Sequence, residues 1–203
     1  MDSDIPIPDQ TKLEKRFAFI EDETQRTNTV IIFRYIIFLI NLAGHHKLPG
    51  PMLYSLYKDI IIQTAIVTES CTHYALKHLI DLDKIKSEDV MEPEWKEEKC
   101  VILEEFDDGN RQVCGVVRHR TTERLTRNTQ LIALNRACLR TGIFTDKVFG
   151  EAEKLRESRN KIHLAGLSNV DELYEQKDVD DHFERARIVI ERIEKVLNDF
   201  KKI

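Results

Sequence analysis

The stretch MLYSLYKDIIIQTAIVTESCTHYALKHLIDL, residues 52–82, decides the fold that the sequence predicts. We expect a single long helix over these residues, because apolar side chains recur at helical spacing throughout. They cover two sides of that helix, with Ile60, Val67, Cys71 and Tyr74 on one and Ile62, Ile66, Leu76 and Ile80 on the other. A helix that is apolar nearly all round is normally central. Glu69 falls within the second stripe, which makes it a candidate buried partner for a cation.

Further helices are expected on both sides of this central stretch. Upstream, we predict helices over residues 10–22 and 27–43, the second capped by Gly44, after a disordered lead-in at residues 1–9. Downstream, helices are predicted over residues 121–141, closed by Gly142, and then from an N-cap at Thr145 onward. The last helix, residues 178–201, repeats apolar residues in steps of four and three. That pattern fits packing inside an antiparallel bundle or a homodimer seam.

Two apolar runs interrupt the helical pattern. Residues 100–106 and 113–117 flank an Asp-Asp-Gly-Asn-Arg sequence, which is typical of a β-hairpin over residues 100–118. The acidic residues 87–99 indicate a linker or a short helix. Two strands alone are only marginally stable, so this hairpin should lie on the helices or on another chain. We therefore expect one all-α domain over residues 10–203, an up-and-down bundle of four to five helices with the hairpin inserted.

The composition is that of a single globular domain. The 203 residues are 41% hydrophobic and 33% charged, and only 7 Gly and 5 Pro interrupt the regular elements. Four widely spaced cysteines without a CxxC pair favour a reduced, cytoplasmic setting without structural zinc. The acidic N-terminus does not resemble a signal peptide. The most apolar run, residues 30–43, is interrupted by Arg34 and Asn41 and is too short to span a bilayer, so no membrane role is expected.

The net charge of −5 is unevenly distributed. Residues 111–140 contain seven arginines and one acid, Glu123. Guanidinium groups bind phosphate oxygens in a bidentate fork, so this region is a candidate RNA-binding patch. The equally open alternative is a solvated face whose cations pair with the acidic remainder of the chain. The arginines proposed to contact RNA are Arg118, Arg120, Arg124 and Arg127.

A polar cluster lies near the end of the helix that follows Thr145. In the stretch LRESRNKIHLAGL, residues 155–167, helical spacing places Arg156, Arg159, Asn160 and His163 on roughly a quarter of the circumference. The same face carries apolar residues in the preceding turns, so the cluster continues a core-facing or interface-facing stripe. Buried charge is costly unless it is paired or used.

These side chains have the chemistry needed to cleave an RNA phosphodiester without a metal or cofactor. His163 ends a helix, which favours the imidazolium, while two arginines oppose it, so we expect a general acid or base. Arg156 and Arg159 would hold the phosphate, and Asn160 would orient the imidazole or a ribose hydroxyl. The alternative is an arginine–carboxylate network, including Glu69, that locks the helix pair.

The motif resembles the HEPN superfamily, in which an arginine precedes a histidine near the end of the third core helix of a four-helix bundle. Arg156 and His163 have six residues between them, and Arg159-Asn160 is the arginine–polar pair usual in the family. The resemblance implies a homodimer whose facing motifs cut RNA and leave 2′,3′-cyclic phosphate ends. It also implies toxin–antitoxin, phage-defence or RNA-processing roles, with a nucleotidyltransferase-type antitoxin as a possible partner. Many relatives have lost catalysis and bind nucleic acid or protein instead.

Overall fold

The computed structural model describes residues 7–107, 109–122, 124–126, 128–161 and 174–201. Within them the chain is mainly α-helical with one two-stranded antiparallel sheet, so the expected mainly-α class is confirmed. Of the predicted lead-in at residues 1–9, the first six residues lie outside the described part of the chain. The elements in chain order are α1 (Gln10–Arg16), α2 (Glu23–His45), α3 (Gly50–Asp81), α4 (Ser87–Val90), β1 (Pro93–Glu105), β2 (Gln112–Thr122), α5 (Leu131–Arg140), α6 (Asp146–Lys161) and α7 (Gln176–Phe200).

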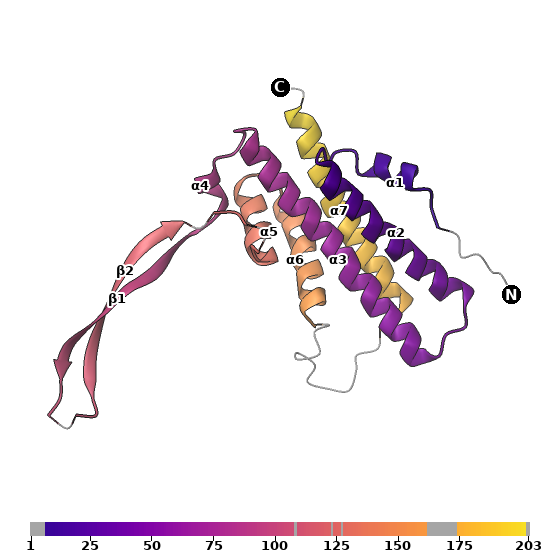
Figure 1. Ribbon diagram of the computed structural model, residues 1–203. Helices are drawn as coiled ribbons and strands as arrows, with labels where there is room; N and C mark the ends of the chain where they lie inside the picture. The colour runs from indigo at the N-terminus through magenta and orange to yellow at the C-terminus, as the bar shows by residue number, and fades with distance from the viewer. Residues whose placement is uncertain (1–6, 108, 123, 127, 162–173, 202–203) are drawn as a thin grey trace.

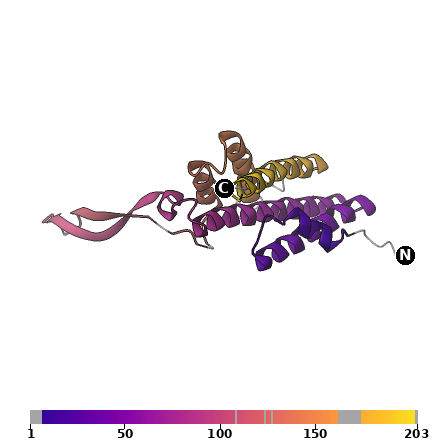
Figure 2. The ribbon, with the colours of Figure 1, turned by 90° about the horizontal axis from the view of Figure 1, so that it is seen from above.

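Helix α3 is the central element, as its nearly continuous apolar surface predicts. It contacts α2, α5, α6 and α7. Seen from above in Figure 2, α2 lies on one side of α3, and α5, α6 and α7 lie on the other. Pro51 stands in the first turn of α3, where its missing amide proton would have no helical partner. The helix therefore begins two residues before the predicted Met52 and runs 32 residues without a break.

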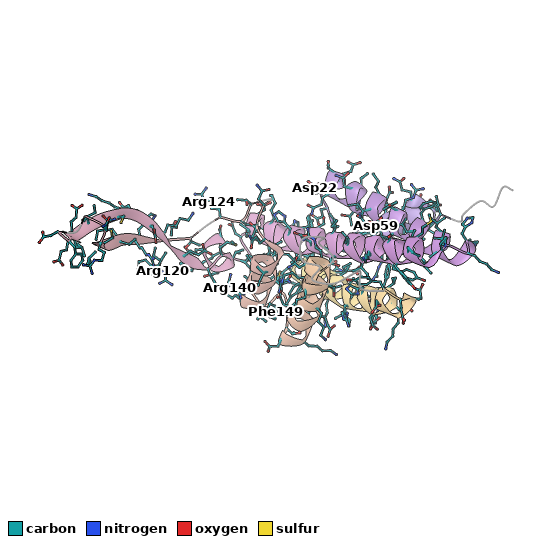
Figure 3. The ribbon with its side chains drawn as sticks, turned by 90° about the horizontal axis from the view of Figure 1, so that it is seen from below. Asp22, Asp59, Arg120, Arg124, Arg140 and Phe149 are labelled. Atoms are coloured by element: carbon teal, nitrogen blue, oxygen red, sulfur yellow. The ribbon has the colours of Figure 1, made fainter. Side chains whose placement is uncertain are left out.

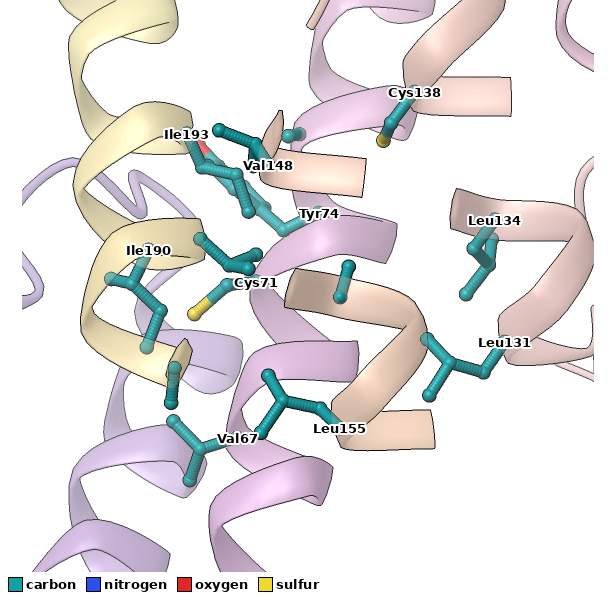
Figure 4. Packing of buried hydrophobic residues seen from close by; sticks show 14 of the residues in the cluster. Val67, Cys71, Tyr74, Leu131, Leu134, Cys138, Val148, Leu155, Ile190 and Ile193 are labelled. Atoms are coloured by element: carbon teal, nitrogen blue, oxygen red, sulfur yellow. The ribbon is translucent and has the colours of Figure 1, made fainter. Parts of the chain in front are cut away.

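A single hydrophobic core lies between these helices. Apolar side chains of α5, α6 and α7 meet those of α3 there, and Figure 4 shows how they interlock. Burying one such large apolar side chain stabilises the fold by about 1.5–3 kcal/mol. The labelled members are Val67, Cys71 and Tyr74 on α3, Leu131, Leu134 and Cys138 on α5, Val148 and Leu155 on α6, and Ile190 and Ile193 on α7.

The regular apolar repeat of α7 packs inside the chain's own bundle. Most of its members are buried, and Phe183 and Phe200 pack partly buried against the same core. Of the two interpretations left open by the sequence, packing within the bundle therefore agrees with the structure. The buried members of the repeat are Val179, Ala186, Ile190, Ile193 and Leu197.

Three buried threonines follow one another along α3. The hydroxyls of Thr64, Thr68 and Thr72 each donate to the carbonyl oxygen four residues earlier, at 2.7, 3.0 and 2.8 Å. Buried hydroxyls are costly without a hydrogen bond. These three find their acceptors within α3 itself, so the threonines can pack in the core.

The hairpin is longer than the predicted residues 100–118. Its register runs from Pro93 opposite Thr122 to Glu105 opposite Gln112. The region before residue 100 was expected to be a linker or short helix because it is acidic and lacks an apolar pattern. Charges pair across the strands instead, as in the 2.8 Å contact between Glu97 and Arg118. Only α4 remains of the predicted short helix.

Helix α5 begins ten residues later than the predicted helix over residues 121–141. Thr121 and Thr122 end β2, and the chain then turns, with the Thr126 amide donating to the Thr129 hydroxyl at 2.9 Å. Threonine hydroxyls compete with helical hydrogen bonds in this way. The predicted end is correct, since Gly142 follows α5 with a φ of 76°.

The hairpin projects away from the helices, as Figures 1 and 2 show. Of the two expected placements, packing on the helices of this chain is not what the structure shows, and packing on another chain stays a prediction. Its apolar side chains are exposed on both faces, with Ile102 56% and Leu103 67% exposed. At the base of this hairpin, which we call the arm, Arg140 donates to the carbonyl oxygen of Val90 and to the Glu92 carboxylate. These bonds connect α5 to the start of the arm.

Helix α2 is the one helix in the described part of the chain that is long and apolar enough to cross a membrane by length and composition. Core helices of globular proteins meet the same criterion. Val30, Ile36 and Leu39 of α2 are buried in the common core, whereas Ile31 and Tyr35 are exposed. The absence of a membrane role remains a prediction.

Candidate active site

Helix α6 positions the polar cluster of the predicted site. Thr145 precedes its first turn, and its hydroxyl accepts from the Val148 amide at 3.4 Å, as expected of the N-cap. Val148, Ala152 and Leu155 are buried. The face of α6 that leads to the motif is thus turned toward the core, as the sequence predicts.

Arg159 joins α6 to the central helix. Its Nη1 donates to Oε2 of Glu69 on α3 at 2.7 Å. The two side chains are 31% and 27% exposed, so the pair lies at the edge of the core and solvent reaches it. Glu69 is therefore the partner of a cation, as its position within an apolar stripe predicts, although it is only partly buried.

Arg156 is held by a different set of residues. Its Nε donates to Oε2 of Glu153 at 2.8 Å, and Oε1 of the same carboxylate accepts from Nδ2 of Asn135 on α5, also at 2.8 Å. Asn135 is fully buried. The sequence missed Glu153 and Asn135, although the spacing of three residues between Glu153 and Arg156 is a helical ion-pair signal. The two motif arginines thus have different partners: Arg156 pairs with Glu153 of its own helix, and Arg159 pairs with Glu69 on α3.

The remaining two members of the motif are Asn160 and His163. Asn160 is exposed in the last turn of the helix. His163 lies outside the described residues. The structure thus brings Arg156, Arg159 and Asn160 to one end of α6, with Glu69 beside Arg159.

An open groove adjoins the Arg159–Glu69 pair. A hollow of about 250 Å³ is lined by Glu69, Ser70, His73, Thr129 and others. A larger hollow of about 940 Å³ shares Ser70 and His73 and continues along α3 toward Arg124. His73 Nε2 lies 3.1 Å from the carbonyl oxygen of Thr126, which can only accept, so this nitrogen carries the proton. Sequence reasoning missed His73, which has no apolar or charged pattern around it to mark it.

Of the four predicted RNA-binding arginines, the structure describes Arg118, Arg120 and Arg124. Figure 3 shows Arg120 on the hairpin and Arg124 at its base, where Arg124 lines the larger hollow. Arg118 is paired with Glu97, and Arg127 lies outside the described residues. The high positive charge of residues 111–140 is also offset in space, because β1 runs beside β2. That strand carries Glu94, Glu97, Glu98, Glu104 and Glu105.

Metal-ligating side chains are not gathered in the described part of the chain. Among those residues, no group of three or more His, Cys, Asp or Glu side chains could hold a metal ion. His45, the last residue of α2, has its Nδ1 2.7 Å from the carbonyl oxygen of Asn41, to which it donates.

Comparison with protein-family models gave no match to this chain. No curated protein matches it either. Among solved structures, likewise, none matches. The functional assignment therefore depends on the chemistry of the residues around α6 and on the exposed hairpin.

Proposed function

We propose that this chain is a HEPN-type endoribonuclease that acts without a metal, as a homodimer with a composite arginine–histidine site. One observation carries the proposal: Arg159, a permanent cation near the end of α6, is partly exposed and is bonded to Glu69, which lines an open groove. A phosphate can compete for a guanidinium that water reaches, because both carboxylate and phosphate accept the same fork of donors.

The residues of the motif divide the reaction between them. His163 removes the proton from the ribose 2′-hydroxyl, whose oxygen then attacks the adjacent phosphorus. The 5′-oxygen of the next nucleotide leaves and takes up a proton, so the products are a 2′,3′-cyclic phosphate and a 5′-hydroxyl. Arg156 and Arg159 stabilise the charge that develops on the phosphate, and Asn160 orients the imidazole or the ribose. A protonated imidazole from the second copy can supply the leaving-group proton.

The arrangement of the helices supports this assignment. In the proposed HEPN-like bundle, α2, α3, α6 and α7 are the four core helices, and α6, the third, carries the motif. The hairpin and α5 are then an insertion between the second and third core helices. A cytoplasmic location, a toxin–antitoxin or phage-defence role and a nucleotidyltransferase-type antitoxin are part of the same proposal.

Incubation of RNA with the protein in EDTA tests the enzyme. We expect the wild type to cleave, His163→Ala to be inactive, and Arg159→Ala to be slower by about 100-fold, the loss typical when one donor to a developing charge is removed. His46→Ala, which changes an exposed histidine after α2, is the matched control and should cleave like the wild type. Identical RNA profiles for His163→Ala and the wild type would reject the proposal.

The second candidate is a catalytically silent HEPN-like module that binds nucleic acid or a protein partner. It is favoured by the carboxylates that occupy both motif arginines and by the exposed apolar side chains of the hairpin. RNA binding that weakens steeply between 50 and 200 mM salt, without cleavage, would support the nucleic-acid form. Loss of that binding in an Arg120→Ala, Arg124→Ala variant would place the RNA at the base of the hairpin.

A further inference from the structure

Two cysteines lie side by side on the exposed hairpin. Cys100 of β1 is opposite Val116, and Cys114 of β2 is opposite Ile102. Residues that face each other across an antiparallel pair, and those two positions further along, project from the same face. The two cysteines are therefore diagonal neighbours on one face, and the Cys100 thiol is in hydrogen-bonding contact with that of Cys114.

The other two cysteines have the opposite environment. Cys71 and Cys138 are buried in the core, and burial raises the pKa of the Cys71 thiol to about 12. A thiol buried in the core is shielded from oxidants, whereas Cys100, whose pKa is also raised by its contact with Cys114, is open to solvent. Of the four cysteines, the two that solvent reaches are the two that touch each other.

We propose that Cys100 and Cys114 are an oxidation site that forms a reversible disulfide across the hairpin, with hydrogen peroxide as the oxidant. One thiolate attacks a peroxide oxygen and the O–O bond breaks. The products are a sulfenic acid on that cysteine and one molecule of water. The second thiol attacks that sulfur and releases a second water. In sum, two thiols and one peroxide give one disulfide and two waters, and a dithiol such as dithiothreitol reverses the change by exchange.

The position of the pair makes this disulfide easy to reduce. Diagonal neighbours have Cα atoms about 7–8 Å apart. A relaxed disulfide needs about 4.4–6.8 Å. The hairpin can supply the difference by twisting, because it projects from the helices and its register shifts on either side of Cys100, between Glu97 and Lys99 and between Ile102 and Glu104. A bond closed under strain is more readily reduced, which suits a reversible site.

The disulfide would act on the apolar half of the arm. Two-stranded ribbons are marginally stable, and a slip by one residue exchanges the side chains of the two faces. A covalent link between Cys100 and Cys114 holds one register and so presents Ile102 and Val116 on a fixed face. This inference does not depend on the ribonuclease proposal.

The experiment uses the position of Arg111, which lies between the two cysteines. The full-length folded protein is treated with peroxide, its free thiols are then alkylated in denaturant, and it is digested with trypsin without reductant. Cleavage after Lys99, Arg111 and Arg118 gives one peptide of residues 100–111 and one of residues 112–118. We expect these two peptides as one linked species that dithiothreitol separates, with Cys71 and Cys138 alkylated. Untreated protein should give the two peptides separately, both alkylated.

Cys114→Ser is the matched control, because it changes one atom on an exposed strand and should abolish the linked species. A non-reducing gel of the intact oxidised protein should show the monomer, which places the bond within one chain. The proposal is overturned if both peptides remain alkylated after peroxide, if they end as separate sulfinic or sulfonic acids, or if the link joins two chains.

Discussion

Arg159 and Glu69 are the contact through which the motif helix is tied to the centre of the fold. We expect Glu69→Gln to lower the free energy of unfolding by roughly 1 kcal/mol, between the values for exposed and buried pairs. Glutamine keeps the shape of the side chain but removes the charge that holds the guanidinium at 2.7 Å. Urea unfolding followed by circular dichroism measures the change. Glu98→Gln, on the exposed hairpin, is the control and should be neutral, and equal stability of the two variants would contradict the prediction.

The sequence predicted part of this site and missed part of it for a physical reason. A carboxylate within an apolar stripe, as at Glu69, has to meet a cation, and periodicity alone showed which face it is on. The second contact of Glu153, the carboxylate that pairs with Arg156, depended instead on where α5 packs. Asn135, eighteen residues from Glu153, reaches it only because the two helices lie side by side. Contacts of that kind are set by tertiary packing and leave no local pattern.

His182 on α7 is a buried histidine that the motif search did not mark. It is 5% exposed, its Nδ1 donates to the Asp178 carbonyl oxygen at 2.7 Å, and its Nε2 has no hydrogen-bond partner among the residues that the structure describes. Burial lowers the pKa of His182. The hydrogen bond to the carbonyl oxygen of Asp178 opposes that shift, and the positive charge of Arg185 lowers the pKa further. The folded protein therefore keeps the imidazole neutral at pH values where the unfolded chain protonates it.

Stability should consequently fall in acid. The unfolded histidine takes up its proton near pH 6.5, so below about that pH the unfolded state binds more protons. We expect the contribution of His182 to be complete above pH 6.5 and to be lost progressively as the pH falls. Urea unfolding from pH 8 to pH 5 would show this slope, and His182→Leu should flatten it. The same slope in His182→Leu as in the wild type would assign it to other groups.

The hairpin, at the scale of elements, is an independent unit. Its strands pair with each other, and its base is closed by Pro93 opposite Thr122. We expect replacement of residues 94–121 by a short Gly-Ser linker to change the free energy of unfolding by no more than about 1 kcal/mol, because the ends already meet and short loops differ little in closure entropy. Thermal and urea unfolding of the variant that lacks the hairpin measure this change in the free energy of unfolding. Collapse of the helical signal would show that the helices need the arm.

Element boundaries were predictable where the apolar period was long. The helix over residues 52–82 and the last helix agree with α3 and α7 to within about two residues, since both bury apolar side chains along their whole length. The length of the hairpin was underestimated because the half nearest the helices is held by charge pairs such as Glu97–Arg118. Such pairs have no hydrophobic signal in the sequence. For α5 the threonines at 121, 122, 126 and 129 marked the non-helical segment.

For the whole molecule, the exposed arm predicts self-association. The apolar repeat of α7 is already buried within the chain, whereas Ile102 and Leu103 on the arm are more than half exposed. We expect the wild type to sediment as a concentration-dependent dimer. An Ile102→Lys, Leu103→Lys variant should dissociate about 100-fold more readily, since each substitution removes an apolar contact worth about 1.4 kcal/mol. A dimer that is unchanged in this variant would place the interface elsewhere, with the motif face of α6 next to be tested.

The threonines at positions 64, 68 and 72 have a consequence for how the whole molecule could rearrange. Because each hydroxyl bonds within α3, none of them ties that helix to a particular residue of a neighbour. A shift of α3 along its axis would therefore break none of these three hydrogen bonds. Such an interface permits sliding between packed helices. A displacement that begins where α6 packs on the core would therefore reach the base of the arm as a small translation of α3 along its axis.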